Sequence, residues 1–437
     1  MPVIITTPFP AQPFFKSITH DAGGVGATGE VVLDPTSDSL YSVGQENVSG
    51  PYVIKFDTDL DNILWSRNFT LFGANSVWAS EADSSGNIYV AGYTEISGPP
   101  FNREEGYVIK YDSSGTLLWE TYIGSGGPPT YGSPRLQERI EGMTIDSSGN
   151  VYLLIEQSFA DTIVVKLNSS GVIQWQRLFA GVRPNSSAPS KMIGTDSTGD
   201  VYFATSGFNI FKLDTSTGAV LWKRQLTGQA SPAGPTPQAT GGLRVTSAGN
   251  VYISGNVTGP GSPTGGTEML VVKYNSSGGY VWGRTLGDAS ASALTDAARG
   301  LAIDPAENVY VTGFFVSMAP DVSVGKFNSA GALKWERTWI NAGVEFANGN
   351  CVADNTYLYM GGQQSNLPWI LRIPTKTGGT TGSCGTASWS SGSLTARVAD
   401  HLQNNVSSVL DSAAGLITWT SSLSAATTPH TITVQCP

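Results

Sequence analysis

The chain has 437 residues, only 13% of them charged, and it carries a formal net charge of −10. This negative balance repels anionic polymers, so nucleic acid is excluded as a partner. No apolar run reaches the roughly 18 residues that a membrane-crossing helix needs, so we expect no membrane span.

Residues 1–13 contain neither the basic region nor the long apolar core of a secretory signal, so we expect an extended N-terminal arm and no signal. The sequence has three cysteines. Cys351 lies in an apolar segment and fits a small buried residue. Cys384 and Cys436 bracket the last part of the chain, and in an oxidising compartment they are candidates for a disulfide.

One phrase recurs along most of the chain. Its clearest copy is DSSGNIYVAG at residues 83–92, and each copy contains a tyrosine near its end. These tyrosines number seven and are Tyr41, Tyr89, Tyr152, Tyr202, Tyr252, Tyr310 and Tyr359. A fixed repeat of this length indicates an array of similar supersecondary units rather than several unrelated domains.

Each repeat predicts four antiparallel strands. In the third copy they are residues 140–145, 150–155, 162–167 and 172–178, joined in pairs by tight Asp-Ser-Ser-Gly and Asn-Ser-Ser-Gly turns. The second and third strands are apolar at consecutive positions, which is typical of sheets covered on both faces. Four-stranded sheets stacked face to face in a ring form a β-propeller, so the fold class is all-β with seven blades.

The seventh repeat supplies only three strands, within residues 349–373, because no fourth-strand tryptophan phrase follows. Residues 14–19 precede the first repeat as a fourth strand precedes each later one. We therefore expect the N-terminal strand to complete the last blade and close the ring, so that residues 14–373 form the propeller.

Residues 374–382 have the composition of a linker, and we expect residues 383–437 to form a small C-terminal β module. Its β-like runs are residues 393–398, 415–419 and 431–435. Apolar residues between 394 and 406 also fit a helical spacing, so a helix there is the alternative. A core this small would gain stability from a disulfide between Cys384 and Cys436.

The two recurring phrases resemble the SBBP-type seven-bladed β-propeller repeat. Residues 304–313 and 271–282 carry the closest matches, and the resemblance covers roughly residues 14 to 373. It implies a scaffold or binding module of the kind found in extracellular, cell-surface and virion proteins of bacteria and their phages. It implies no particular activity.

Three repeated features admit both a chemical and a structural interpretation. The first is a basic residue at one position of every third strand: Lys55, Lys110, Lys166, Lys212, Lys273, Lys326 and Arg372. The second is the tryptophan series of the fourth strands, which offers sugar-stacking platforms or packing: Trp65, Trp119, Trp175, Trp222, Trp282 and Trp335. The third is the Asp-x-x-Gly-Asn turn, which supplies too few carboxylates for calcium. We favour the structural interpretation of all three.

The connections that do not repeat are better candidates for function. Turns between strands one and two and between strands three and four are short, whereas the other two kinds of connection vary in length and share the opposite face of the ring. The long ones are residues 95–105, 124–138, 181–190, 227–240, 259–268 and 287–296. The candidate binding residues on this face are Arg103, Glu104, Glu105, Tyr131, Arg135 and Glu138.

No catalytic or metal-binding motif is present, since the three histidines His20, His401 and His430 stand in no catalytic or zinc spacing. We expect no enzymatic activity and no cofactor. The sequence favours a virion structural protein of a bacteriophage, used in assembly or attachment, with other virion proteins or a host-surface glycan or protein as partners and possible homo-oligomers. The alternative is a secreted or cell-surface bacterial binding module, and the third hypothesis is a quinone-type propeller enzyme.

Overall fold

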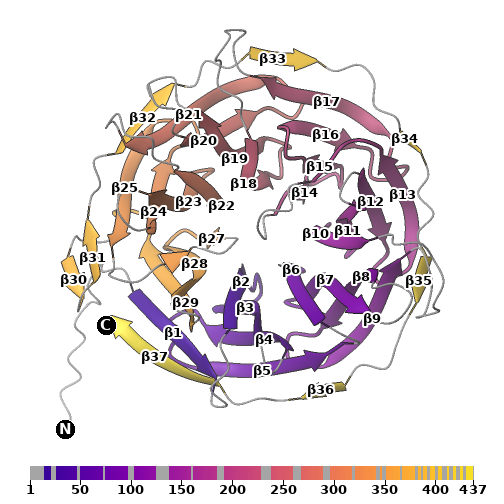
Figure 1. The fold of residues 1–437 in the computed structure, drawn as a ribbon, viewed down its shortest axis with the longest axis horizontal. Helices are drawn as coiled ribbons and strands as arrows, with labels where there is room; N and C mark the ends of the chain where they lie inside the picture. Colours follow the sequence, from indigo (N-terminus) through magenta and orange to yellow (C-terminus); the bar gives the residue numbers. More distant parts are fainter. Residues whose placement is uncertain are drawn as a thin grey trace.

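A computed structural model of the chain shows a ring of seven β-sheets around a central axis (Figure 1). It describes residues 14–20, 26–46, 50–71, 74–96, 103–124, 137–158, 161–184, 191–227, 238–258, 267–288, 296–316, 320–340, 345–346, 351–364, 367–378, 382–384, 387–390, 394–398, 402–405, 411–412, 417–419, 424–426 and 430–436. Within these residues every regular element is a strand, and no helix has the length and apolar character to cross a bilayer.

The blades are numbered here in chain order, with strands given from the axis outward. Blade 1 contains β2 (Gly26–Leu33), β3 (Ser39–Glu46), β4 (Gly50–Asp57) and β5 (Ile63–Thr70). Blade 2 contains β6 (Ala74–Ala82), β7 (Ile88–Ile96), β8 (Arg103–Tyr111) and β9 (Leu117–Gly124). Blade 3 contains β10 (Glu138–Ile145), β11 (Val151–Gln157), β12 (Asp161–Leu167) and β13 (Ile173–Phe179). Blade 4 contains β14 (Ile193–Thr195), β15 (Val201–Ala204), β16 (Asn209–Leu213) and β17 (Val220–Thr227).

The remaining blades follow the same plan. Blade 5 contains β18 (Gln238–Val245), β19 (Val251–Thr258), β20 (Thr267–Tyr274) and β21 (Tyr280–Asp288). Blade 6 contains β22 (Ala297–Ile303), β23 (Val309–Val316), β24 (Pro320–Phe327) and β25 (Leu333–Ile340). Blade 7 contains β26 (Glu345–Phe346), β27 (Cys351–Ala353), β28 (Tyr357–Gln364), β29 (Leu367–Pro374) and β1 (Phe14–His20). The predicted seven-bladed fold is therefore confirmed.

The ring closes through the N-terminal strand, as predicted. Strand β1 pairs antiparallel with β29, with Phe14 opposite Arg372 and Ser17 opposite Trp369. Blade 7 therefore combines strands from both ends of the propeller sequence, and the blades cannot separate at this point without breaking that ladder.

The C-terminal strands form no module of their own, which corrects the expectation for residues 383–437. Only β30 (Gly382–Cys384) and β31 (Ala387–Ser390) pair with each other, and β31 in turn pairs with β25. The other strands each add to the outer strand of one blade: β32 (Leu394–Val398) to β21, β33 (Leu402–Asn405) to β17, β34 (Asp411–Ser412) to β13, β35 (Ile417–Trp419) to β9, β36 (Ser424–Ala426) to β5 and β37 (His430–Cys436) to β1.

We call the strands β30 to β37 the belt, because Figure 1 shows them around the outside of the ring in the opposite order to the blades. The belt has a physical reason: the outer strand of each blade offers unpaired backbone N–H and C=O groups, and segments this short have no core of their own. The alternative helix is not formed either, since β32 and β33 occupy residues 394–398 and 402–405 as strands.

The repeated Asp-Ser-Ser-Gly phrase forms the expected turn. In blade 2 the carboxylate of Asp83 accepts hydrogen bonds from the backbone N–H of Ser85 and Asn87, at 2.9 and 3.0 Å. Gly86 has a φ of 75°, in the left-handed region that side chains disfavour. The hydroxyl of Tyr89 donates to the same carboxylate at 3.1 Å, so the turn also fixes the buried tyrosine.

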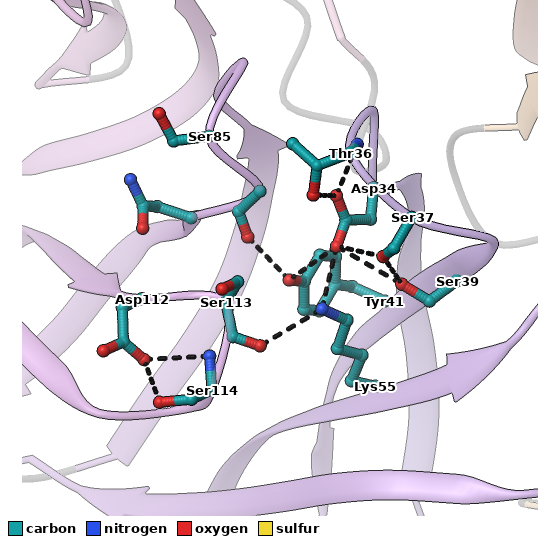
Figure 2. A network of polar contacts seen from close by, with 12 residues as sticks. Asp34, Thr36, Ser37, Ser39, Tyr41, Lys55, Ser85, Asp112, Ser113 and Ser114 are labelled. Atoms are coloured by element: carbon teal, nitrogen blue, oxygen red, sulfur yellow. Dashed lines mark hydrogen bonds and ion pairs between the residues drawn. The ribbon is translucent and has the colours of Figure 1, made fainter.

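The repeated lysine and tryptophan fasten each blade to the next. In blade 1 the Lys55 ammonium lies 2.8 Å from the Asp34 carboxylate and donates to the Ser113 carbonyl, in a turn of blade 2, at 3.1 Å (Figure 2). The indole N–H of Trp65 donates to that same carbonyl at 3.0 Å. Tyr41 reaches blade 2 as well, through a 2.7 Å bond to the Gly86 carbonyl.

We call this junction the blade latch: an indole N–H on the fourth strand of one blade bonded to a carbonyl in the second hairpin turn of the next. It recurs at every junction from blade 1 to blade 7, through the tryptophans Trp65, Trp119, Trp175, Trp222, Trp282 and Trp335. The structural interpretation of the lysine and tryptophan series is thus confirmed, because their polar atoms bond to the adjacent blade or to the turn carboxylate.

The junction between blade 7 and blade 1 has no tryptophan, and an arginine takes its place. Arg372 donates from Nη1 to the Thr58 carbonyl at 2.9 Å and to the Asp59 carboxylate at 2.6 Å. A guanidinium has more donors than an ammonium and makes both contacts at once.

The turn glycine of each latch packs against the tryptophan ring of the preceding blade. A Cβ atom added to Gly218, which has a φ of 71°, would lie 2.8 Å from the Trp175 ring. Gly181 has a similar φ of 69°, but a Cβ there would meet nothing within 4 Å. These two glycines separate the cost of the backbone conformation from the cost of the lost blade contact.

We predict that Gly218→Ala lowers the free energy of unfolding by about 1 to 3 kcal/mol more than Gly181→Ala does. Gly181→Ala should cost only the left-handed conformation, about 1 kcal/mol. Chemical denaturation of both variants and the parent measures the difference. Equal losses would show that packing of the turn against the tryptophan does not stabilise the ring.

Candidate functional site

The faces of the ring differ in how much the repeat determines them. The short turns of the repeat lie on one face. The strand ends that flank the variable connections lie at the other, which we call the loop face. Of the six candidate binding residues, Tyr131 and Arg135 fall in residues 125–136, outside the described part of the chain. Arg103 begins β8, where its backbone is opposite Ile96. The binding role of these three residues stays a prediction.

The other three candidates are buried strand residues rather than exposed loop residues, which corrects the expectation. Glu104 and Glu105 lie in β8 and Glu138 begins β10, with exposures of 8%, 1% and 0%. Glu104 and the residue before Glu138 are joined by an isolated bridge between blades 2 and 3. The strands extend further toward the loop face than the apolar pattern predicts, so these carboxylates lie between blades.

Two ion pairs lie near these carboxylates, one made by Glu104 and the other by Glu156. The Arg139 guanidinium binds the Glu104 carboxylate through Nε and through Nη2, the latter at 2.7 Å, and lies over the Tyr93 ring at 4.8 Å. Arg183, after β13, donates to Glu156 of β11 at 2.8 Å. The hydrogen bonds that Arg139 donates to Glu104 raise the pKa of Arg139, which therefore stays charged.

Glu141 lies between these pairs and lacks such a partner. It is the extra residue of the β-bulge between Ile140 and Gly142 in β10, and only 3% of its surface is exposed. Neither carboxylate oxygen has a hydrogen-bond partner among the described residues. Burial raises the pKa of Glu141 well above its usual range, and the Glu156 carboxylate raises it further, against the opposing effect of Arg139.

This set of residues combines a buried acid of raised pKa with two ion pairs. A buried acid beside two ion pairs titrates at an unusual pH, and perturbed acids are often found at functional sites. The described residues include no group of three or more His, Cys, Asp or Glu side chains placed to hold a metal ion. The cluster is therefore the candidate site at which the loop face responds to pH or to a neighbouring charge.

A second charged cluster lies at the axis, where the inner strands approach one another. The Glu30 carboxylate of blade 1 accepts a hydrogen bond from the Ser80 hydroxyl of blade 2 at 2.6 Å. Lys191, before β14 of blade 4, forms an ion pair with Glu81 of blade 2. Burial, together with repulsion from Arg244, lowers the pKa of Lys191 to about 7.

Arg244 completes the axial cluster from the other side. It lies in β18 of blade 5 and donates from Nη2 to the carbonyl of Cys351, in β27 of blade 7, at 3.3 Å. The Lys191 contact joins blade 4 to blade 2, and the Arg244 contact joins blade 5 to blade 7. Because neither pair of blades is adjacent, these side chains reach across the axis. Paired polar groups therefore bridge the axis at this level.

Sequence reasoning missed Arg139, Glu141, Glu156 and Arg183, and also Glu30, Glu81, Lys191 and Arg244. None of them recurs from blade to blade, so a search for repeated positions passes over them. The sequence feature that could have identified them is a charged residue among the apolar residues of a strand, in a chain with few charges. That feature indicates that the charged side chain is buried, but it does not indicate which residue of another blade the side chain contacts.

Comparison with known proteins supports the fold. A family model described as "Outer membrane protein assembly factor BamB" matches residues 50–259, somewhat less than half of the chain. It is a different propeller model from the SBBP-type repeat, so that finer assignment stays a prediction. A search of curated protein sequences finds no match.

Three solved structures illustrate the similarity. U3-55K is 10% identical, with a TM-score of 0.55 over 82% of this chain and 98% of that one. BamB from Moraxella catarrhalis is 16% identical, with a TM-score of 0.44 over 82% and 100%. Quinohemoprotein alcohol dehydrogenase from Comamonas testosteroni is 10% identical, with a TM-score of 0.45 over 82% and 78%. Of these three, U3-55K alone has a TM-score above 0.5, and at 10% identity this likeness supports the propeller fold alone.

We predict that Glu141→Gln stabilises the protein at pH 8 by about 1 to 3 kcal/mol and has little effect at pH 4. A raised native pKa means that the folded state binds more protons than the unfolded state above the ordinary pKa of a glutamate. The parent therefore loses stability as pH rises through the native pKa, whereas the amide loses none. Denaturation at several pH values measures this dependence.

Glu156→Gln is the matched control, because Glu156 already has Arg183 as a partner. It should destabilise the protein at pH 8 by leaving the arginine without its carboxylate. If Glu141→Gln destabilises the protein at pH 8 as much as Glu156→Gln does, Glu141 is ionised and structural in the folded state. That result would contradict a raised pKa for Glu141.

Proposed function

We propose that this protein is a non-enzymatic binding scaffold that presents its loop face to a macromolecular partner. One observation carries the proposal: the repeated polar side chains are used between blades, whereas the strand ends at the loop face carry unrepeated charges such as Glu104, Arg139 and Arg183. A rigid frame with irregular connections on one side is a common design for binding proteins. The ring positions the loops, and the loops determine the partner.

The axial cluster supports a non-enzymatic role over a quinone-type enzyme. The polar atoms that face the axis pair with one another across blades, as Lys191 does with Glu81 and Ser80 with Glu30. A cofactor at this level would need to displace those pairs and leave buried charges without partners, which is costly. A bound quinone at the axis would overturn the proposal.

For the biological setting we propose a bacteriophage virion, where a closed, sparsely charged ring serves assembly or attachment to a host-surface glycan or protein. The second candidate is a secreted or surface-bound bacterial binding module. The family match to an outer membrane protein assembly factor favours this second setting. Both settings place the protein outside the bacterial cytoplasm, and both use the same loop face.

A photo-crosslinking experiment tests the binding face. A photoreactive phenylalanine analogue is placed at Arg103, which begins β8 at the loop face, or at Tyr131, which we expect there from the sequence. The comparison positions are Ser148 and Ser170, in exposed turns on the opposite face. Each variant is produced in the organism that encodes the chain and irradiated. We expect adducts to other macromolecules from positions 131 and 103, and at least about tenfold less from the turn positions.

Mass spectrometry of the adducts then separates the settings. Capsid or tail proteins as partners support the virion, and envelope proteins or surface glycans support the bacterial surface. Adducts formed mainly from Ser148 and Ser170 would contradict the proposal, because the partner would then bind the turn face. Adduct-free variants at all four positions would equally contradict a binding role.

A further inference from the structure

Two of the three histidines of the chain meet in blade 7, although they come from opposite ends of the sequence. His20 is the last residue of β1, and His430 is the first residue of β37. The two strands are antiparallel neighbours, and their register places His20 directly opposite His430. Spacing along the sequence gives no sign of this pair, because only the closure of the ring and the return of the belt bring the two strands together.

The register is regular at this end of the ladder. The irregularity between β1 and β37 lies at the other end, between Phe15 and Lys16, so it does not shift the alignment of the histidines. Directly opposed residues of antiparallel strands lie on the same face of a sheet, with Cβ atoms about 4.5 to 5.5 Å apart. His20 and His430 therefore occupy one face of the blade 7 sheet as immediate neighbours.

The pair lies where the outer two strands extend beyond the rest of the sheet. Among the described strands of blade 7, none lies outside β37. On the inner side, the ladder between β1 and β29 runs from Phe14 to Ser17 and so ends before His20 is reached. Outer strands run from the turn face to the loop face, so this end of β1 and β37 lies at the loop face.

The chemistry of two adjacent imidazoles favours a bound metal ion over protonation of both rings. Two protonated histidines would place like charges directly opposite each other, which is unfavourable. Neutral imidazole is a good ligand for Zn²⁺, Cu²⁺ and Ni²⁺. Zinc binds imidazole nitrogens at about 2.0 to 2.1 Å, so two such nitrogens on one tetrahedral ion are roughly 3.5 Å apart. A direct cross-strand pair has a spacing of Cβ atoms that suits this requirement.

We propose that His20 and His430 bind one divalent transition-metal ion of the zinc class, and that this ion fastens the last strand of the belt to the strand that closes the ring. Two protein ligands leave the other positions of a tetrahedral ion to water or to a further ligand. Separation of β37 from β1 would remove one of the two histidines from the ion. Metal binding therefore stabilises the pairing of these two strands.

The first test is a calorimetric titration of the full chain with ZnCl₂ at pH 7.5, without an affinity tag. We expect one zinc ion per chain, and binding at least about tenfold weaker after His20→Asn or His430→Asn. The double variant should bind no better than either single variant. His401→Asn alters the third histidine and should bind zinc as the parent does. Unchanged affinity in the double variant, or no zinc binding by the parent, would overturn the proposal.

Thiolates also bind zinc, so the variant Cys384→Ser/Cys436→Ser is a second control. Cys436 is opposite Phe15, at the other end of the ladder from His430. We expect this variant to keep the affinity of the parent. Loss of zinc binding in it would assign the ion to the cysteines and contradict the histidine site.

Proton release during binding reports how many imidazoles take part. Zinc binds the neutral ring, and the ordinary pKa of histidine is about 6.5. At pH 5.5 we therefore expect zinc to displace more than one proton from the parent and at most one from either single histidine variant. Calorimetry in buffers of different ionisation enthalpy measures the number. Equal release from the parent and the single variants would rule out a site built from both histidines.

Amide hydrogen exchange tests whether the ion fastens the two strands. At a free zinc concentration ten times Kd, exchange of the β37 amides should slow about tenfold in the parent, because the ladder opens only after the ion dissociates. A chelator should reverse the effect. His430→Asn should exchange like the metal-free parent at the same zinc concentration. Zinc binding that leaves the exchange of β37 unchanged would contradict the fastening role.

Discussion

Every blade depends on a contact that its neighbour supplies. A four-stranded sheet that is apolar on both faces cannot bury those faces alone, and its hairpin turn leaves a carbonyl that needs a donor. The indole N–H of Trp175 and the ammonium of Lys166 both donate to the Thr215 carbonyl in the next blade, at 3.0 and 2.9 Å. Packing and hydrogen bonding between blades thus occur at the same place, and they set the spacing around the ring.

This arrangement changes the electrostatic role of the repeated charges. Burial alone would raise the pKa of Asp34, but hydrogen bonds from Lys55, Thr36 and Ser37 together lower it to about 2. An ion pair that is partly buried and fully hydrogen-bonded stabilises the propeller, and its charges are not free to bind a partner. Charges available for recognition must therefore come from outside the repeat, as the half-exposed guanidinium of Arg183 does.

The sequence predicted the parts of the fold that side-chain patterns encode. Turn residues, consecutive apolar positions and the recurring lysine each have a local signature, and the strand at Phe14 was found because the seventh repeat lacked one. The belt was missed because edge pairing uses backbone atoms, so strands such as β34 (Asp411–Ser412) need no apolar pattern. The contact between Glu81 and Lys191 was missed because only the closed ring brings them together.

Closure, latches and belt all indicate a ring that unfolds as one body. Amide hydrogen exchange in increasing denaturant tests this cooperativity most directly, because it follows each blade separately. Our account predicts that the slowest amides of all seven blades exchange through one opening, with a common free energy and denaturant dependence. Groups of blades with different opening energies would contradict it, because the latches would then not couple each blade to the next.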